Sequence, residues 1–115
     1  MTSVVSKEVR WKQAGGKQEQ LMEKRIVRKS VRFFGIVQGV GFRYKAIRAA
    51  RAAGATGWVR NEYDGSVTME IQGTYWQIEQ VISELQVDRF IRIEDMDVRR
   101  IDPVEGEREF RTLWS

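Results

Sequence analysis

A short glycine-containing loop carries residues whose types and spacing suit the binding of a phosphoryl group. The loop joins a predicted strand to a predicted helix and consists of Gln38, Gly39, Val40, Gly41 and Phe42. Its two glycines let successive backbone N–H groups turn toward one point, where the N–H groups of the helix start also lack partners. Such an arrangement binds anions, although a merely tight loop has the same sequence features.

Two cations, Arg43 and Lys45, follow in the first turn of the predicted helix. No Ser, Thr, Asp or Asn stands at the expected N-cap position, and the helix dipole disfavours a cation there by a few tenths of a kcal/mol. A bound phosphate would satisfy the N–H groups, the dipole and the Arg43 guanidinium together, so a phosphate site is one interpretation of these features and a merely tight loop is the other. The loop is not a P-loop, because GxxxxGKS or GxxxxGKT is absent, and GxG without a third glycine is a weak indication of dinucleotide binding.

Asn61 is the second candidate for chemistry. It ends a predicted strand, where one interpretation is a turn-forming Asn and the other is a carboxamide that holds a water by donating and accepting at once. Asp95-Met96-Asp97 resembles a nucleophile-plus-acid pair of the phosphotransferase type. That pair lies too near the chain end for the α/β domain that such chemistry requires.

Composition narrows the possible chemistry. The chain has 115 residues, enough for one domain, with no Cys and no His. These zeros exclude disulfides, cysteine nucleophiles, the usual zinc sites, phosphohistidine chemistry and a Ser-His-Asp triad. An enzyme with this composition must use Arg, Lys, Asp, Glu, Asn, Ser, Thr, Tyr or backbone groups.

The charge is divided between two halves of the domain. Residues 24–61 contain ten Lys or Arg and no Asp or Glu, whereas residues 62–115 contain thirteen acidic residues and six Arg. With a net charge of +4 and a pI near 9.7, the chain is expected to bind a polyanion or a small anionic substrate. A solvated basic face is the alternative interpretation of the same charge run.

Short alternating elements must position these residues. Period-2 and helical patterns predict strand 27–35, helix 42–53, strands 56–61 and 67–71, helix 75–86, and strands 94–101 and 110–114. Asp64-Gly65 suits a hairpin turn, and Thr74 with Gln77 fits a capping box at the second helix. The order β-α-β-β-α-β plus a short C-terminal strand predicts an α+β, ferredoxin-like split βαβ fold, with two helices on one face of an antiparallel sheet.

We expect two regions, a flexible N-terminal extension over residues 1–23 and one domain over residues 24–115. No apolar run approaches the roughly 20 residues that cross a bilayer, and the N-terminus has no apolar leader segment. We therefore expect a cytoplasmic monomer without membrane contact.

Two segments resemble the signature segments of the acylphosphatase family. They are Gly35-Ile-Val-Gln-Gly-Val-Gly-Phe-Arg43 and Gly57-Trp-Val-Arg-Asn61, followed by Gly65-Ser-Val67 and Gly73. The similarity covers roughly residues 25–114. Phe33 is a departure, since the family usually has a smaller aliphatic residue there. The extension before residue 24 is another, since family members usually begin close to the first strand.

The resemblance implies the ferredoxin-like fold and the hydrolysis of acyl phosphates to a carboxylate and inorganic phosphate, without metal or cofactor. The catalytic Arg of the family falls on Arg43 and its catalytic Asn on Asn61. Arg43 and the loop N–H groups would hold the phosphoryl oxygens, and Asn61 would orient the attacking water. The expected partners are thus a small acyl phosphate and inorganic phosphate.

Two other functions remain open at this point. A ferredoxin-like sheet can bind RNA, but no RNP-type strand is present, and adjacent Phe33 and Phe34 point to opposite faces. Nucleic acid is therefore not an expected partner. The other alternative is a non-catalytic anion-binding domain, and the presence of both Arg43 and Asn61 argues against it.

Overall fold

The computed structural model describes residues 24–114, which form five strands and two helices. In chain order these are β1 (Val27–Ile36), α3 (Phe42–Ala53), β2 (Thr56–Asn61), β3 (Val67–Gly73), α4 (Tyr75–Gln86), β4 (Arg92–Ile101) and β5 (Phe110–Thr112). The order confirms the predicted ferredoxin-like α+β fold. β4 begins at 92 instead of 94, and β5 ends at 112 instead of 114. The predicted extension over residues 1–23 lies outside the described residues.

The sheet has the strand order β4-β1-β3-β2-β5. The strands from β4 to β2 pair in antiparallel fashion, as predicted. β5 departs from the prediction because it runs parallel to β2, pairing Phe110 with Gly57. The reason is where β4 ends. The last residue of β4, Ile101, pairs with Arg28, and this row of paired residues continues across β3 to the start of β2. β4 therefore ends at the end of the sheet where β2 begins. The chain enters β5 from that end, so β5 runs in the same direction as β2.

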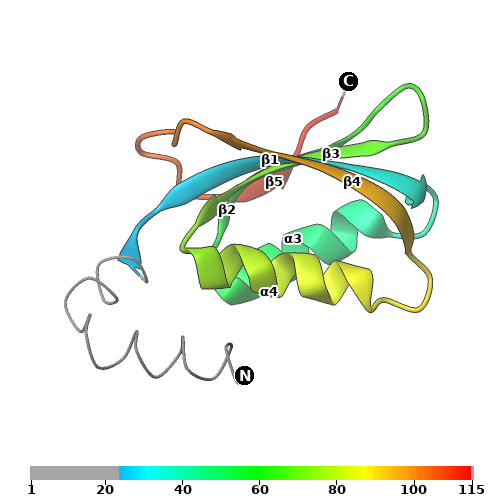
Figure 1. The fold of residues 1–115 in the computed structure, drawn as a ribbon, viewed down its shortest axis with the longest axis horizontal. Helices are drawn as coiled ribbons and strands as arrows, with labels where there is room; N and C mark the ends of the chain where they lie inside the picture. Colours follow the sequence, from blue (N-terminus) through cyan, green and yellow to red (C-terminus); the bar gives the residue numbers. More distant parts are fainter. Residues whose placement is uncertain (1–23, 115) are drawn as a thin grey trace, which may run out of the picture.

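Both helices cover one face of the sheet, and the core lies between the helices and that face (Figure 1). The buried residues of the helices recur at helical spacing: Phe42, Ala46, Ala49 and Ala50 in α3, and Ile78, Val81, Ile82 and Leu85 in α4. Val31 and Phe33 of β1 are fully buried opposite them. The Phe33 and Phe42 rings pack with their centroids 4.9 Å apart. The large residue at position 33 therefore fills the core next to the start of α3.

The opposite face of the sheet carries a buried arginine on β1. Arg28 is only 1% exposed. Its Nε donates to Glu70 at 2.9 Å, and its Nη1 donates to Gln72 at 3.0 Å and to Glu107 at 2.7 Å. Burial lowers the pKa of this guanidinium, but the hydrogen bonds and charges of Glu107 and Glu70 outweigh burial and raise the pKa from its usual value. Because Glu107 belongs to the connection between β4 and β5, Arg28 fixes that connection on the sheet.

Candidate active site

The two helices begin in different ways. Thr74 caps α4, accepting from Gln77 N at 3.2 Å while Gln77 Oε1 accepts from Thr74 N at 2.8 Å, which confirms the predicted capping box. The N-cap residue of α3 is Gly41, whose φ of 79° lies in the left-handed region that glycine adopts readily, and no side chain caps the helix. Gly39 has a similar φ of 76°. The first N–H groups of α3 therefore lack a side-chain acceptor, as the sequence predicted.

A pocket of about 370 Å³ lies at the start of α3 and brings both predicted segments together. Its lining includes Arg43, Asn61 and four of the five predicted loop residues: Gln38, Gly39, Gly41 and Phe42. Val40 is not part of the lining, because its side chain packs against the core. The glycine loop with Arg43 and the end of β2 with Asn61 thus meet in one cavity, although about twenty residues separate them along the chain.

Arg43 is the one charged residue in the described lining of this pocket. Within residues 24–114 it has no carboxylate at ion-pair distance, unlike Arg28 or Arg32. Its guanidinium carbon instead lies 4.5 Å from the centroid of the Trp114 ring, a cation–π contact. The N–H groups of Arg43 are therefore not used by any described carboxylate, and an anion in the pocket could accept from them.

Sequence reasoning missed the other walls of the pocket, which are Val37, Tyr44, Ile47, Thr112 and Trp114. Ile47 lies one helical turn after Arg43 and could have been found from its spacing. Trp114 had no such indication, since it was predicted to be the last residue of a strand. It reaches the pocket because β5 lies next to β2, a pairing that only the sheet topology decides.

Asn61 ends β2 and lines the pocket, and the hydrogen bonds of the following turn come from other residues. The turn after it is closed by Glu62 N, which donates to Ser66 O at 2.8 Å. Asp64 Oδ1 accepts from Ser66 N at 3.0 Å and from Ser66 Oγ at 2.6 Å. Of the two interpretations of Asn61, this geometry favours a role in the pocket, because Asp64 supplies the turn chemistry.

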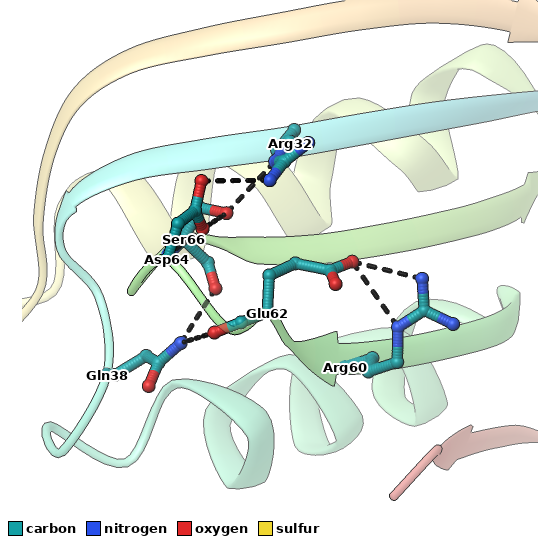
Figure 2. Close-up of polar contacts among 6 residues, drawn as sticks. All are labelled: Arg32, Gln38, Arg60, Glu62, Asp64 and Ser66. Atoms are coloured by element: carbon teal, nitrogen blue, oxygen red, sulfur yellow. Dashed lines mark hydrogen bonds and ion pairs between the residues drawn. The ribbon is translucent and has the colours of Figure 1, made fainter. Parts of the chain in front are cut away.

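The side chain of Gln38 ties the loop to the strand end that carries Asn61. Its Nε2 donates to Glu62 O and to Ser66 O, each at 2.8 Å (Figure 2). From the sequence we expected only a backbone role for Gln38, so this side-chain contact was missed. Its effect is to fix the distance between the N–H groups of the loop and the residue that follows Asn61.

The acidic residues next to the site are held by arginines of the sheet (Figure 2). Arg32 donates to Asp64 at 2.9 Å and to Ser66 Oγ at 2.9 Å, while Arg60 pairs with Glu62 at 3.0 Å. The hydrogen bonds from Ser66, together with Arg32, hold the pKa of Asp64 below its usual range. Figure 2 shows the Glu62 side chain extending toward Arg60, away from Gln38. Neither carboxylate is among the residues that line the pocket.

Lys45 does not lie where the sequence suggested. From the sequence it was grouped with Arg43 as a cation at the helix start that a bound anion would neutralise. Its Nζ donates to Asp88 Oδ1 at 2.9 Å and to Val40 O at 3.0 Å, and it does not line the pocket. The unfavourable position of this ammonium at a helix start is therefore compensated by the chain itself. Arg43 alone retains the arrangement that the sequence suggested.

Within the described part of the chain, no group of three or more acidic, His or Cys residues could hold a metal ion. None of the helices in residues 24–114 combines the length and apolar character needed to span a bilayer.

Comparison with known proteins identifies relatives of the same fold. The family model described as Acylphosphatase matches residues 29–112. An acylphosphatase of Salinibacter ruber is 43% identical over 90 residues, which cover 77% of this chain and 92% of that protein. The crystal structure of acylphosphatase from Bacillus subtilis has a TM-score of 0.70 and 27% identity, covering 76% of this chain and 98% of that one.

A structure of full-length HypF in its phosphate- and nucleotide-bound form also matches, with a TM-score of 0.70 and 28% identity. The match covers 78% of this chain but only 12% of HypF, so the likeness is to one part of a larger protein. The family model and the Salinibacter ruber relative each span most of the present chain. This chain belongs to the acylphosphatase family.

Proposed function

We propose that the protein is a hydrolase that cleaves acyl phosphates to a carboxylate and inorganic phosphate. Membership of the acylphosphatase family supports the reaction class. The observation that carries the proposal is the single pocket in which Arg43, Asn61 and the glycine loop meet. These residues supply an anion site and a polar amide beside it, which is what attack of water on a bound phosphoryl group requires.

In this proposal Arg43 and the N–H groups of the loop hold the phosphoryl oxygens. A guanidinium can donate to two oxygens at once, and the described residues leave its donors without a carboxylate partner. The positive-φ glycines 39 and 41 orient neighbouring N–H groups, and the dipole of α3 adds to the attraction. The apolar and aromatic walls formed by Tyr44, Ile47 and Trp114 would contact the acyl part.

Asn61 would orient the attacking water by donating to and accepting from it. The water oxygen forms a bond to phosphorus while the bond between phosphorus and the acyl oxygen breaks, and the electron pair leaves with the carboxylate. The proton of the water passes to the product phosphate or to solvent. A carboxylate is a good leaving group and the transition state is loose, so the step needs no strong general base. We therefore propose a reaction without metal or cofactor.

The protein is proposed to act as a monomer in the cytoplasm on a small-molecule substrate. The proposal of a monomer is supported by the pocket, because both segments that form it come from the same chain. A nucleic-acid partner is not proposed, since Phe33 is buried and the sequence has no RNP-type strand.

The test is release of inorganic phosphate from benzoyl phosphate, measured with and without a chelator. We expect saturable release that the chelator leaves unchanged. Competitive inhibition by inorganic phosphate is also expected, since the product would occupy the same N–H groups. Phosphate binding without turnover would contradict hydrolysis and support the non-catalytic anion-binding alternative. Loss of activity with the chelator would contradict the metal-free reaction.

A further inference from the structure

The carbonyl of Val40 in the glycine loop is held from outside the pocket. Lys45 Nζ donates to Val40 O at 3.0 Å and to Asp88 Oδ1 at 2.9 Å. Both partners of this ion pair are largely shielded, with the Lys45 and Asp88 side chains 27% and 20% exposed. The contact therefore has more strength than a fully solvated surface pair.

This contact determines which way one peptide group of the loop faces. The Val40 carbonyl and the Gly41 N–H belong to the same planar trans peptide, so they point in opposite directions. Gly41 lines the pocket, whereas Val40 and Lys45 do not. With the carbonyl held by Lys45, the N–H is directed to the pocket side. A flipped peptide would present an oxygen to the anion instead of a donor.

The loop sequence by itself does not prevent such a flip. Gly39 and Gly41 flank Val40, and glycine adopts positive and negative φ with similar ease. No cap side chain holds the start of α3 either. The external partner of the Val40 carbonyl therefore supplies a constraint on the orientation of this peptide that the loop sequence lacks.

Asp88 connects this constraint to the rest of the fold. It follows α4, and its Oδ1 also accepts from Phe90 N at 2.8 Å and from Ile91 N at 3.1 Å. β4 begins at Arg92, the residue after Ile91. Arg92 pairs with Ile36, at the end of β1 that leads into the loop. Figure 1 shows the β1–α3 loop and the α4–β4 connection at the same end of the sheet. The hydrogen bond from Lys45, with that from Phe90 N, lowers the pKa of Asp88, so the carboxylate stays ionised near neutral pH.

We propose that Lys45 and Asp88 are positioning residues for the phosphoryl group, holding the Val40–Gly41 peptide so that its N–H faces the pocket. The proposal rests on the proposed function, because it assumes that the pocket binds phosphate. Neither side chain touches the substrate. Their effect passes through the backbone of the loop.

The proposal and direct electrostatic attraction predict opposite effects of one substitution. Asp88→Asn removes a negative charge near the site, so simple electrostatic attraction predicts tighter phosphate binding. Tighter binding is also predicted if Lys45, once released from Asp88, contacts the phosphate directly. Positioning predicts weaker binding, because the amide holds Lys45 less strongly than the carboxylate does. The Asn oxygen can still accept from Phe90 N and Ile91 N, so the turn is retained.

The experiment measures the competitive inhibition constant of inorganic phosphate, kcat and KM for benzoyl phosphate in the full chain. We compare Asp88→Asn, Lys45→Met and the matched control Arg48→Met, which removes the same charge from an exposed position of the same helix. We expect the inhibition constant to rise about tenfold for Lys45→Met, about threefold for Asp88→Asn, and less than about twofold for Arg48→Met. KM for benzoyl phosphate should rise together with the inhibition constant, while kcat changes less.

A second readout follows the backbone amide of Gly41 by NMR during phosphate titration. Its resonance should shift in the wild-type chain and in Arg48→Met, and shift much less in Lys45→Met. Tighter phosphate binding by Asp88→Asn, or equal effects of Lys45→Met and Arg48→Met, would overturn the inference while leaving the proposed function intact. A wild-type chain that neither binds phosphate nor hydrolyses benzoyl phosphate would overturn both.

Discussion

Two arginines on opposite sides of the sheet show how differently one residue type is used in this protein. Arg28 lies on the open face, is 1% exposed, and donates to Glu70, Gln72 and Glu107. Arg43 lies at the start of α3 on the helical side and lines a pocket without a carboxylate partner in residues 24–114. The Arg28 guanidinium is bonded within the chain and stabilises the fold, whereas the Arg43 guanidinium lies beside a pocket with donors that an anion could use.

The difference follows from the cost of burying charge. Removing a guanidinium from water costs several kcal/mol unless ion pairs and hydrogen bonds replace its hydration, so Arg28 requires its three partners. Arg43 is only partly buried, so its guanidinium is not fully removed from solvent and does not require a partner within the chain. Substitution of Arg43 should therefore lower activity with little effect on stability, whereas substitution of Arg28 should lower stability with little effect on activity.

The largest effect is expected at Arg43. Arg43→Ala should lower kcat/KM for benzoyl phosphate by about 10³-fold or more, because it removes the one charged group in the described lining. Arg43→Lys should also fail, since a point charge does not reproduce the two-pronged guanidinium. The melting temperature should change little. A near-wild-type kcat/KM in either variant would show that Arg43 does not bind the phosphoryl group.

Asn61 should separate chemistry from anion binding. Asn61→Ala is expected to lower kcat by about 10²-fold or more, because the attacking water loses its orientation. The competitive inhibition constant of phosphate should stay roughly unchanged, since the loop and Arg43 hold the anion. A large loss of phosphate affinity in a folded Asn61→Ala protein would contradict this division of roles.

Arg28 should show the converse behaviour. Arg28→Met leaves Glu70 and Glu107 without their partner and is expected to cost about 3 kcal/mol of unfolding free energy, or roughly 10–20 °C in melting temperature. The folded protein should keep its kcat/KM. Arg99→Met is the matched control, because its pair with Asp97 is long and exposed, at 3.4 Å, and should contribute less than about 0.5 kcal/mol. Equal losses in the two variants would refute a structural role for Arg28.

Acid should weaken the hairpin that supports Asn61. The pKa of Asp64 is lowered in the folded protein by Ser66 and Arg32, so its ionisation stabilises the fold above the unfolded pKa of about 4 and this stabilisation is lost as the pH falls further. Thermal melts between pH 7 and pH 3 should show a smaller acid-dependent decrease for Asp64→Asn than for the wild-type chain. Identical pH profiles would mean that Asp64 does not link stability to pH.

The smallest effect is expected from deleting residues 1–23. This segment has no periodic apolar face in sequence, so its loss should leave the melting temperature and kcat/KM nearly unchanged. Its basic residues, Lys7, Arg10, Lys12 and Lys17, could still speed encounter with anions at low salt. Thermal melts and kcat/KM at two salt concentrations test this. A decrease of roughly 10 °C would show that the segment stabilises the domain.

Local sequence features were sufficient to predict the elements and to propose the main candidate site residues. The Thr74–Gln77 capping box and the Asp64-Gly65 turn depend on residues within three positions of one another, and both form as predicted. Arg43 and the loop were found from glycines and a missing N-cap, which are also local. Asn61 was found as a polar residue at a strand end, and its location in the same pocket is a result of the pairing between β2 and its neighbours.

Tertiary structure decided the contacts that join distant parts of the chain. Arg28 meets Glu107 across 79 positions, and Lys45 meets Asp88 across 43 positions, and neither pair has a periodic or compositional trace in the sequence. Trp114 reaches Arg43 only because β5 adds to the edge of β2 in parallel. The physical reason is that helix, turn and cap preferences act over a few residues, whereas the partner of a charged side chain is set by strand order and register. The sequence by itself therefore determined which residues could bind an anion, and the fold decided which of its cations were already satisfied.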